Sequence, residues 1–172
     1  MQLIAPSIGQ KNRFSYAANG LDSLSLASLA CRLKTTISTT NSATQTTKNT
    51  PLVVVTSSAF EAQRLLEEIP YFAPDLSVNL LPDWETLPYD VFSPHPDLIS
   101  ERLATLYQIS QNQCDVVIVP IATALIRLPA VAYLAGHSFM LKKNQQLHLE
   151  ALRHQCAQAG YHHVSQIGRA HV

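Results

Sequence analysis

Short runs of β-branched residues, separated by segments of helical periodicity, constrain the fold more than any other feature of the chain. The first run is Leu52–Val55 and the last is Asp115–Pro120. Such runs are typical of strands that are buried on both faces of a parallel sheet. Residues 76–81 predict a further strand between them. Strands that alternate with helices along the chain predict an α/β domain built around a parallel sheet.

Helical segments lie between and after these strands. Ser57 or Ser58 forms a capping box with Glu61, which predicts a helix that Pro70 ends. Its apolar stripe is Phe60, Leu65, Leu66 and Ile69. Residues 82–96 contain four prolines and predict an extended segment, after which Asp97 begins a second helix. The periodic residues of that helix are Leu98, Ile99, Arg102, Leu103, Leu106 and Tyr107. Residues 121–128 predict a short helix after the last strand.

The N-terminal part of the chain divides into a helical segment and a polar one. Residues 21–33 predict a helix that Asp22 or Ser23 caps. Its stripe is Leu21, Leu24, Ser28, Leu29, Cys31 and Leu33. Residues 34–50 are almost entirely Thr, Ser, Asn and Gln, with no periodic apolar face. We therefore expect a disordered surface loop at 34–50.

The pattern changes near residue 130, which predicts a boundary between two domains. Residues 137–143 alternate loosely, as an exposed strand would. Residues 147–156 form a helical stripe that ends at Gly160, and residues 161–165 begin another strand. We expect an α/β domain at 1–130, followed at 131–166 by the start of a small α+β domain.

Composition excludes several classes of protein. Charged residues make up 14% of the chain, and twelve basic residues cancel twelve acidic ones to give a net charge of +0. Proteins that grip phosphate backbones usually carry a basic excess or stripe. No apolar run approaches the roughly 18 residues of a membrane span, and the N-terminus lacks a signal-peptide pattern. We expect a cytoplasmic protein with no membrane partner.

The motifs of common active sites are missing from the chain. It contains no GxxxxGK[ST] loop and no HExxH, and adjacent His162-His163 make a poor metal pair. Asp83, Glu85 and Asp90 lie in a Pro-rich segment without a nearby Lys, which favours turn-capping carboxylates. In the same segment, Trp84 is a packing anchor rather than a platform for nucleobases. The sequence predicts no catalytic residue, no cofactor-binding residue and no metal ligand.

One alternative function comes from the predicted fold. A free-standing α/β domain that binds a ligand or nucleotide would use the crevice at the carboxyl ends of its strands. Residues 56–58 and 120–123 would line that crevice, with helix N-termini to hold an anion. Thr and Ser at these positions are also ordinary helix caps.

A specific resemblance begins at Leu81. Residues 81–90 read LPDWETLPYD and residues 92–95 read FSPH. This segment closely resembles the signature of bacterial transcription-repair coupling factors, and the match extends over about residues 51–166. The signature residues, all expected to be structural, are Asp83, Trp84, Glu85, Leu87, Pro88, Tyr89, Asp90, Ser93, Pro94 and Arg102.

The resemblance implies a fold and a set of partners. In that family the N-terminal region is similar to the excinuclease B component: a P-loop-like α/β domain precedes a small domain that contacts the excinuclease A component. A polymerase-binding domain and an ATP-driven DNA translocase follow. The resemblance therefore implies a non-catalytic module of nucleotide excision repair, which recruits the excinuclease after RNA polymerase stalls. ATP and Mg²⁺ would belong to the longer parent, because residues 18–24 carry no Lys for a phosphate.

The sequence departs from the family pattern in two places. The polar stretch 34–50 is longer than the usual connection there. The pattern also stops after Gln166, and residues 167–172, IGRAHV, read as the translation of a sequencing adapter. We therefore expect a truncated gene, with an incomplete domain for the excinuclease A component at 131–166. The arginines through which the family is thought to bind that component would lie beyond it.

Overall fold

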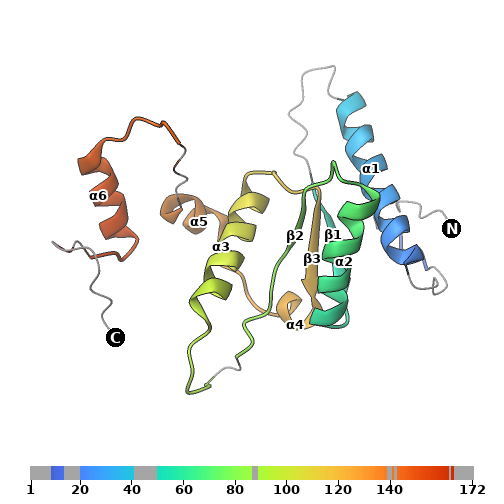
Figure 1. Cartoon of the computed structure of the whole chain (residues 1–172), viewed down its shortest axis with the longest axis horizontal. Helices are drawn as coiled ribbons and strands as arrows, with labels where there is room; N and C mark the ends of the chain where they lie inside the picture. The colour runs from blue at the N-terminus through green and yellow to red at the C-terminus, as the bar shows by residue number, and fades with distance from the viewer. Residues whose placement is uncertain are drawn as a thin grey trace. The chain divides into compact units, whose positions relative to one another are not determined.

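The structure is a computed structural model that describes residues 9–13, 20–40, 50–86, 89–138, 141, 143–162 and 164. The chain divides into two compact units, residues 1–127 and residues 128–172. In the first unit, strands β1 (Leu52–Thr56), β2 (Val78–Leu80) and β3 (Val116–Pro120) form one sheet. Their order is β1-β3-β2, and both pairings are parallel (Figure 1). The predicted α/β class with a parallel sheet is confirmed.

The strands differ in how deeply they are buried. Every residue of the central strand β3 is buried. On the edge strand β1, Val53 and Val55 are 58% and 53% exposed, while Leu52 and Val54 pack against the core. The prediction that β1 is buried on both faces is therefore wrong. A run of valines reports β propensity, and the position of a strand at the edge of a sheet decides how many of its faces are covered.

Helix α2 (Ala59–Phe72) covers the face of the sheet that carries Val116 and Ile118. Its predicted capping box is confirmed: the Glu61 N–H donates to Ser58 Oγ at 3.2 Å, and Glu61 Oε2 accepts from Ser57 Oγ at 2.7 Å. Two details of the helix predicted here were wrong. Phe60 is 81% exposed, so the buried face consists of Ala62, Leu65 and Ile69. Pro70 lies inside the helix, in its last turn.

Helix α1 (Leu21–Thr40) packs against α2 and is longer than predicted. The expected loop at 34–50 is wrong for residues 34–40, and residues 41–49 lie outside the described residues. Two contacts favour the helical extension. Thr35 Oγ1 donates to the carbonyl of Cys31, and Lys34 Nζ lies 2.8 Å from Asp115 Oδ2. The buried face of α1 also differs from the predicted stripe, because Leu21, Leu24 and Cys31 are exposed. Small residues occupy it instead: Ser23, Ser25, Ala27 and Ala30.

An ion pair joins these two helices and should make their packing depend on pH. Arg64 Nη2 lies 2.6 Å from Asp22 Oδ2, and this hydrogen bond is the main cause that lowers the pKa of Asp22 below 3.8. A carboxyl group with a lowered pKa stabilises the fold above its unfolded-state pKa, and the contribution is lost as pH falls through the folded value. We expect Asp22→Asn to cost less than about 1 kcal/mol near neutral pH, because the pair is partly exposed. In urea unfolding below pH 3.8, the difference from wild type should shrink toward zero.

A matched control for this pair is Glu150, whose bond to Arg153 is largely exposed. Glu150→Gln should leave stability unchanged at every pH. A cost for Asp22→Asn that stayed constant on acidification would contradict the assignment to the ion pair.

Helix α3 (Pro96–Ser110) lies on the opposite face of the sheet from α2. Asn79, which is in register with Val117, donates to Gln108 Oε1 of this helix. Thr105 Oγ1 donates to the carbonyl of Leu80 at 2.9 Å. The helix begins at Pro96, one residue before the predicted start, because proline fits the first turn of a helix. The short helix α4 (Ile121–Ala124) follows β3 directly and is shorter than the predicted 121–128.

The second unit contains helices α5 (Val131–His137) and α6 (Leu149–Gln158). The predicted helix that ends at Gly160 is confirmed: Gly160 has a φ of 90°, and the Tyr161 N–H donates to the Cys156 carbonyl at 3.0 Å. Helix α5 was not predicted. The predicted strand at 137–143 begins too early, because His137 belongs to α5. Residues 139, 140 and 142 of that segment, and 163 and 165 of the strand predicted at 161–165, lie outside the described residues. Among the helices of the described residues, none combines the length and the apolar character needed to cross a membrane.

Candidate functional site

The signature segment begins where β2 ends. The Leu81 N–H donates to the carbonyl of Ile118 at 2.9 Å, and both Leu81 and Pro82 are buried. The chain then leaves the sheet, and in Figure 1 it extends beyond the strand ends before it returns at α3. This is the carboxyl edge of β2 and β3, the place where open α/β sheets commonly bind ligands.

Arg102 is the centre of the contacts around this segment. It projects from α3, its side chain is 3% exposed, and it donates from Nη1 to the carbonyl of Pro82. Its guanidinium carbon lies 4.3 Å from the centroid of the Trp84 ring, which is cation–π geometry. Burial lowers the pKa of Arg102 from its ordinary value, and the charge of Asp83 partly opposes that shift. Arg102 therefore fixes the start of the segment against α3.

Asp83 ties the same segment to α4. Its Oδ1 accepts from the Trp84 N–H at 2.9 Å and from Thr123 Oγ1 at 3.4 Å. Thr123 is 1% exposed and belongs to α4. The carboxylate thus bonds within its own segment and to α4. Together with the contact between Arg102 and Pro82, this bond connects the segment to α3 and α4.

Beyond Trp84 the backbone adopts conformations that ordinary residues avoid. Glu85 and Tyr89 have φ values of 57° and 74°. Left-handed backbone at residues other than glycine costs of order 1 kcal/mol each and persists only where the surroundings hold it. The side chains that follow are exposed, with Tyr89 at 104% and Phe92 at 79%.

The structure therefore brings together only some of the predicted signature residues. Asp83, Trp84 and Arg102 form one connected cluster. The exposed signature residues are Glu85, Tyr89, Asp90 and Ser93, and Pro94 is half-buried. Leu87 and Pro88 lie outside the described residues. Residue 123 was expected to line the crevice, but the bonds that Thr105 and Thr123 make were not predicted. Threonines in otherwise helical segments are a weak signal of side chains that bond to a neighbouring loop.

The alternative anion site at the start of α2 is already occupied by a side chain of this chain. Glu61 Oε2 accepts from both the N–H and the Oγ of Ser57. Thr56 Oγ1 donates to the carbonyl of Ser58. No Lys or Arg lies between residues 50 and 63, so a phosphate would meet a carboxylate without a compensating cation. Within the described parts of the chain, no group of His, Cys, Asp and Glu is placed to hold a metal ion.

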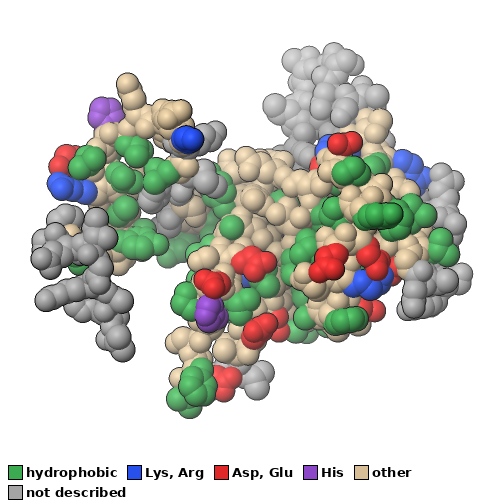
Figure 2. All heavy atoms as spheres, in the orientation of Figure 1, with side chains coloured by type: hydrophobic (Ala, Val, Ile, Leu, Met, Phe, Trp, Pro, Cys, Tyr) green, Lys and Arg blue, Asp and Glu red, His purple; other side chains and the backbone are tan. Residues whose placement is uncertain are grey.

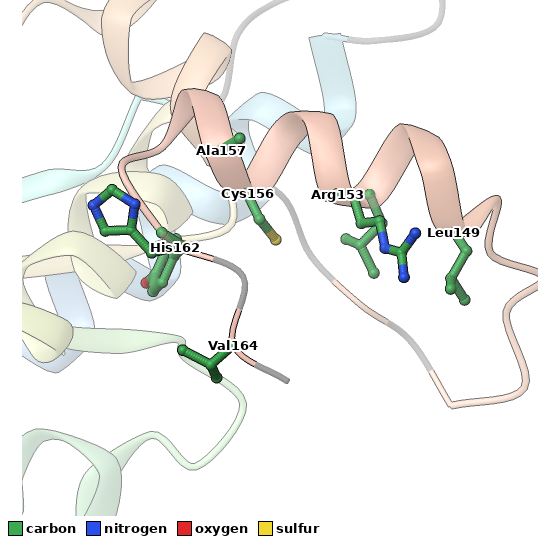
Figure 3. A pocket seen from close by; sticks show the side chains of 8 residues that line it. Leu149, Arg153, Cys156, Ala157, His162 and Val164 are labelled. Carbon is green, nitrogen blue, oxygen red and sulfur yellow. The ribbon is translucent and has the colours of Figure 1, made fainter. Parts of the chain in front are cut away.

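The second unit carries a hollow of about 600 Å³ beside α6. Figure 3 shows its lining side chains on one face of the helix and on the stretch that follows. They are Leu149, Leu152, Arg153, Cys156, Ala157, Tyr161, His162 and Val164. The lining is mostly apolar, as expected for one uncovered side of an amphipathic helix.

Comparisons with known proteins point to one group. No family model matches the chain. It is 47% identical over 117 residues to the transcription-repair-coupling factor of Escherichia coli, which is 68% of this chain and 10% of that protein. It is 38% identical over 112 residues to the factor of Haemophilus influenzae, 65% of this chain and 9% of that protein. The factor of Bacillus subtilis is 23% identical over 162 residues, 94% of this chain. The chain thus spans about a tenth of the length of these relatives.

Proposed function

Because the chain belongs to the transcription-repair-coupling factor family, we propose that it acts as a non-catalytic, positioning module of transcription-coupled DNA repair. The contacts of the signature residues support this proposal. Asp83, Trp84 and Arg102 contact one another and the backbone, so none of them presents a reactive group to a substrate. A cluster of this kind holds a segment in place.

The start of α2 supports the same proposal. In a nucleotide-binding α/β domain, backbone N–H groups at a helix start receive phosphate, and a Lys neutralises its charge. Here Glu61 receives the Ser57 N–H, and its carboxylate repels an anion. ATP binding and hydrolysis would then belong to the parts of the longer factor that lie outside this chain, together with Mg²⁺.

The partners of the module follow from the family and are part of the proposal. The longer factor would release stalled RNA polymerase and recruit the excinuclease. The second unit would contribute to contact with the excinuclease A component, and the other nine tenths of the relatives' length would contact polymerase and DNA. The near-zero net charge of this chain agrees with a module that does not itself grip DNA.

Isothermal titration with ATP and Mg²⁺ tests the absence of a nucleotide site. We expect no saturable heat at millimolar ATP and no release of phosphate above background, for wild type and for Ser58→Ala alike. Ser58→Ala is the matched variant because it alters the start of α2, where the anion would bind. Stoichiometric ATP binding that Ser58→Ala abolishes would contradict the proposal, and would favour a free-standing ligand-binding domain instead.

A further inference from the structure

Three large apolar side chains project into solvent on the protruding part of the signature segment. Tyr89, Val91 and Phe92 are 104%, 93% and 79% exposed. With Asp90 they form what we call the tip, residues 89–92. Single exposed apolar residues are ordinary on protein surfaces, but adjacent exposed aromatic and aliphatic side chains mark an interaction site. Aromatic residues are also the ones that most often anchor protein interfaces.

The surroundings of the tip are strongly acidic. Four of the twelve acidic residues of the chain lie between residues 85 and 101, all of them exposed, and no Lys or Arg lies among them. They are Glu85, Asp90, Asp97 and Glu101. Figure 2 shows red acidic side chains beside green apolar ones on this protruding part. The nearest Lys or Arg in sequence, Arg102, is buried against Trp84, and its charge acts on Asp83.

The base of the protrusion is held firmly while its end is exposed. Arg102, Trp84 and Asp83 anchor the start of the segment, and α3 begins at its other end. The left-handed backbone at Glu85 and Tyr89 lies between these anchors. Strained backbone that is held by its surroundings points to a function for the segment. Apolar side chains that are presented in a fixed place bind at a smaller entropic cost than those on a loose chain.

We propose that the tip docks into an apolar socket rimmed by Lys and Arg on a separate protein. Charge complementarity identifies this occupant, because the acidic flank repels nucleic acid and anionic membranes and attracts a basic protein surface. Tyr89 and Phe92 fill the socket, and Glu85 and Asp90 face its basic rim. The inference does not rest on the proposed function, because it concerns exposed residues outside the Arg102 cluster.

Titration of the whole 172-residue chain with two synthetic peptides tests whether the tip prefers a partner that is both apolar and basic. One peptide alternates Arg and Leu, and the other has Gln in place of each Arg. We expect the Arg peptide to bind at least about tenfold tighter. The double variant Tyr89→Ser/Phe92→Ser should weaken that binding by about tenfold or more, and so should Glu85→Gln/Asp90→Asn. Equal binding of the two peptides would overturn the proposal.

A matched control removes two exposed aromatic side chains elsewhere in the first unit. Phe60 and Tyr71 are 81% and 83% exposed on α2, and acidic Glu67 lies on the same helix. Phe60→Ser/Tyr71→Ser should change binding by less than about twofold. If this control lost as much binding as the tip variant, the contact would be unspecific and the proposal would fail. Circular dichroism should show that all variants remain folded, because none of these side chains is buried.

Photocross-linking in cells identifies the occupant. A benzophenone amino acid is placed at position 92 and, as the control, at position 60. The proposal predicts an adduct with one protein at position 92 alone, which disappears when Lys and Arg at the cross-linked surface of that protein are changed to Glu. An adduct with a second copy of this chain, an adduct that survives the charge reversal, or no adduct at position 92 would each overturn it.

Discussion

Replacement of Arg102 by Ala is expected to lower the free energy of unfolding of the first unit by about 2 to 4 kcal/mol. The side chain is buried, donates to the Pro82 carbonyl and covers the Trp84 ring. Its loss leaves a buried carbonyl without a donor, removes the cation–π contact and opens space under the tryptophan. The cost of burying the charge, which lowers the pKa of Arg102, offsets part of this loss.

Denaturant unfolding followed through Trp84 measures this effect, because Trp84 is the single tryptophan of the chain. Its emission should also move to longer wavelength in the folded Arg102→Ala variant, as water reaches the ring. Arg102→Lys should recover only part of the stability, because an ammonium group does not stack as a planar guanidinium does. Arg153→Ala, at a half-exposed arginine, should change stability by less than about 0.5 kcal/mol. Equal costs for the two alanine variants would contradict the role assigned to Arg102.

Replacement of Ile118 by Ala should cost about 3 kcal/mol, because it opens a cavity at the centre of the sheet. Ile118 is 0% exposed, lies on the middle strand and contacts the core formed by α2. A small domain is stable by only about 5 to 15 kcal/mol in total, so this one change would remove roughly a fifth to a half of its free energy of unfolding.

The neighbouring Ile121 is the matched control, with the same side chain three residues further along. It is 46% exposed at the start of α4, so Ile121→Ala should cost less than about 1 kcal/mol. Thermal unfolding of the two variants side by side separates the effect of burial from the effect of removing the same side-chain atoms at an exposed position. If Ile121→Ala proved as costly as Ile118→Ala, then β3 would not be the centre of the core.

Local patterns predicted the parts of the fold that depend on one element at a time. The valine-rich β3 and the capping box of α2 are both visible within a few residues of sequence. The order β1-β3-β2 is not, because it depends on which strands meet in space. The exposure of Val53 could not be predicted for the same reason, since β propensity carries no information about position in a sheet.

The errors in α1 have a different physical origin. The predicted buried face of α1 included the large apolar residues Leu21 and Leu24. In the structure, α1 packs closely on α2 through Ala27 and Ala30. Small residues allow two helices to approach, so they can form a buried face without a strong apolar pattern. The polar composition of residues 34–40 predicted a loop, whereas the contact of Lys34 with Asp115 favours the helix.

The candidate site was predicted in part, and through the family signature rather than from general chemistry. Asp83, Trp84 and Arg102 were named from sequence, but their mutual contact was not. The bonds of Thr105 and Thr123 were not predicted, because a threonine that bonds to a distant carbonyl or carboxylate leaves only a weak local signal. Contacts between residues that are far apart in the chain require the fold before they can be seen.

The edge position of β1 has a consequence for the behaviour of the protein at high concentration. Within the described residues, β1 pairs on one side only, with β3. An open strand edge with apolar side chains is a template on which another chain can add a strand, and many proteins block such edges with Lys or Pro. Residues 52–56 contain neither, and two of their valines are more than half exposed. At high protein concentration, we therefore expect self-association of the first unit to begin at this edge rather than at the buried strand β3.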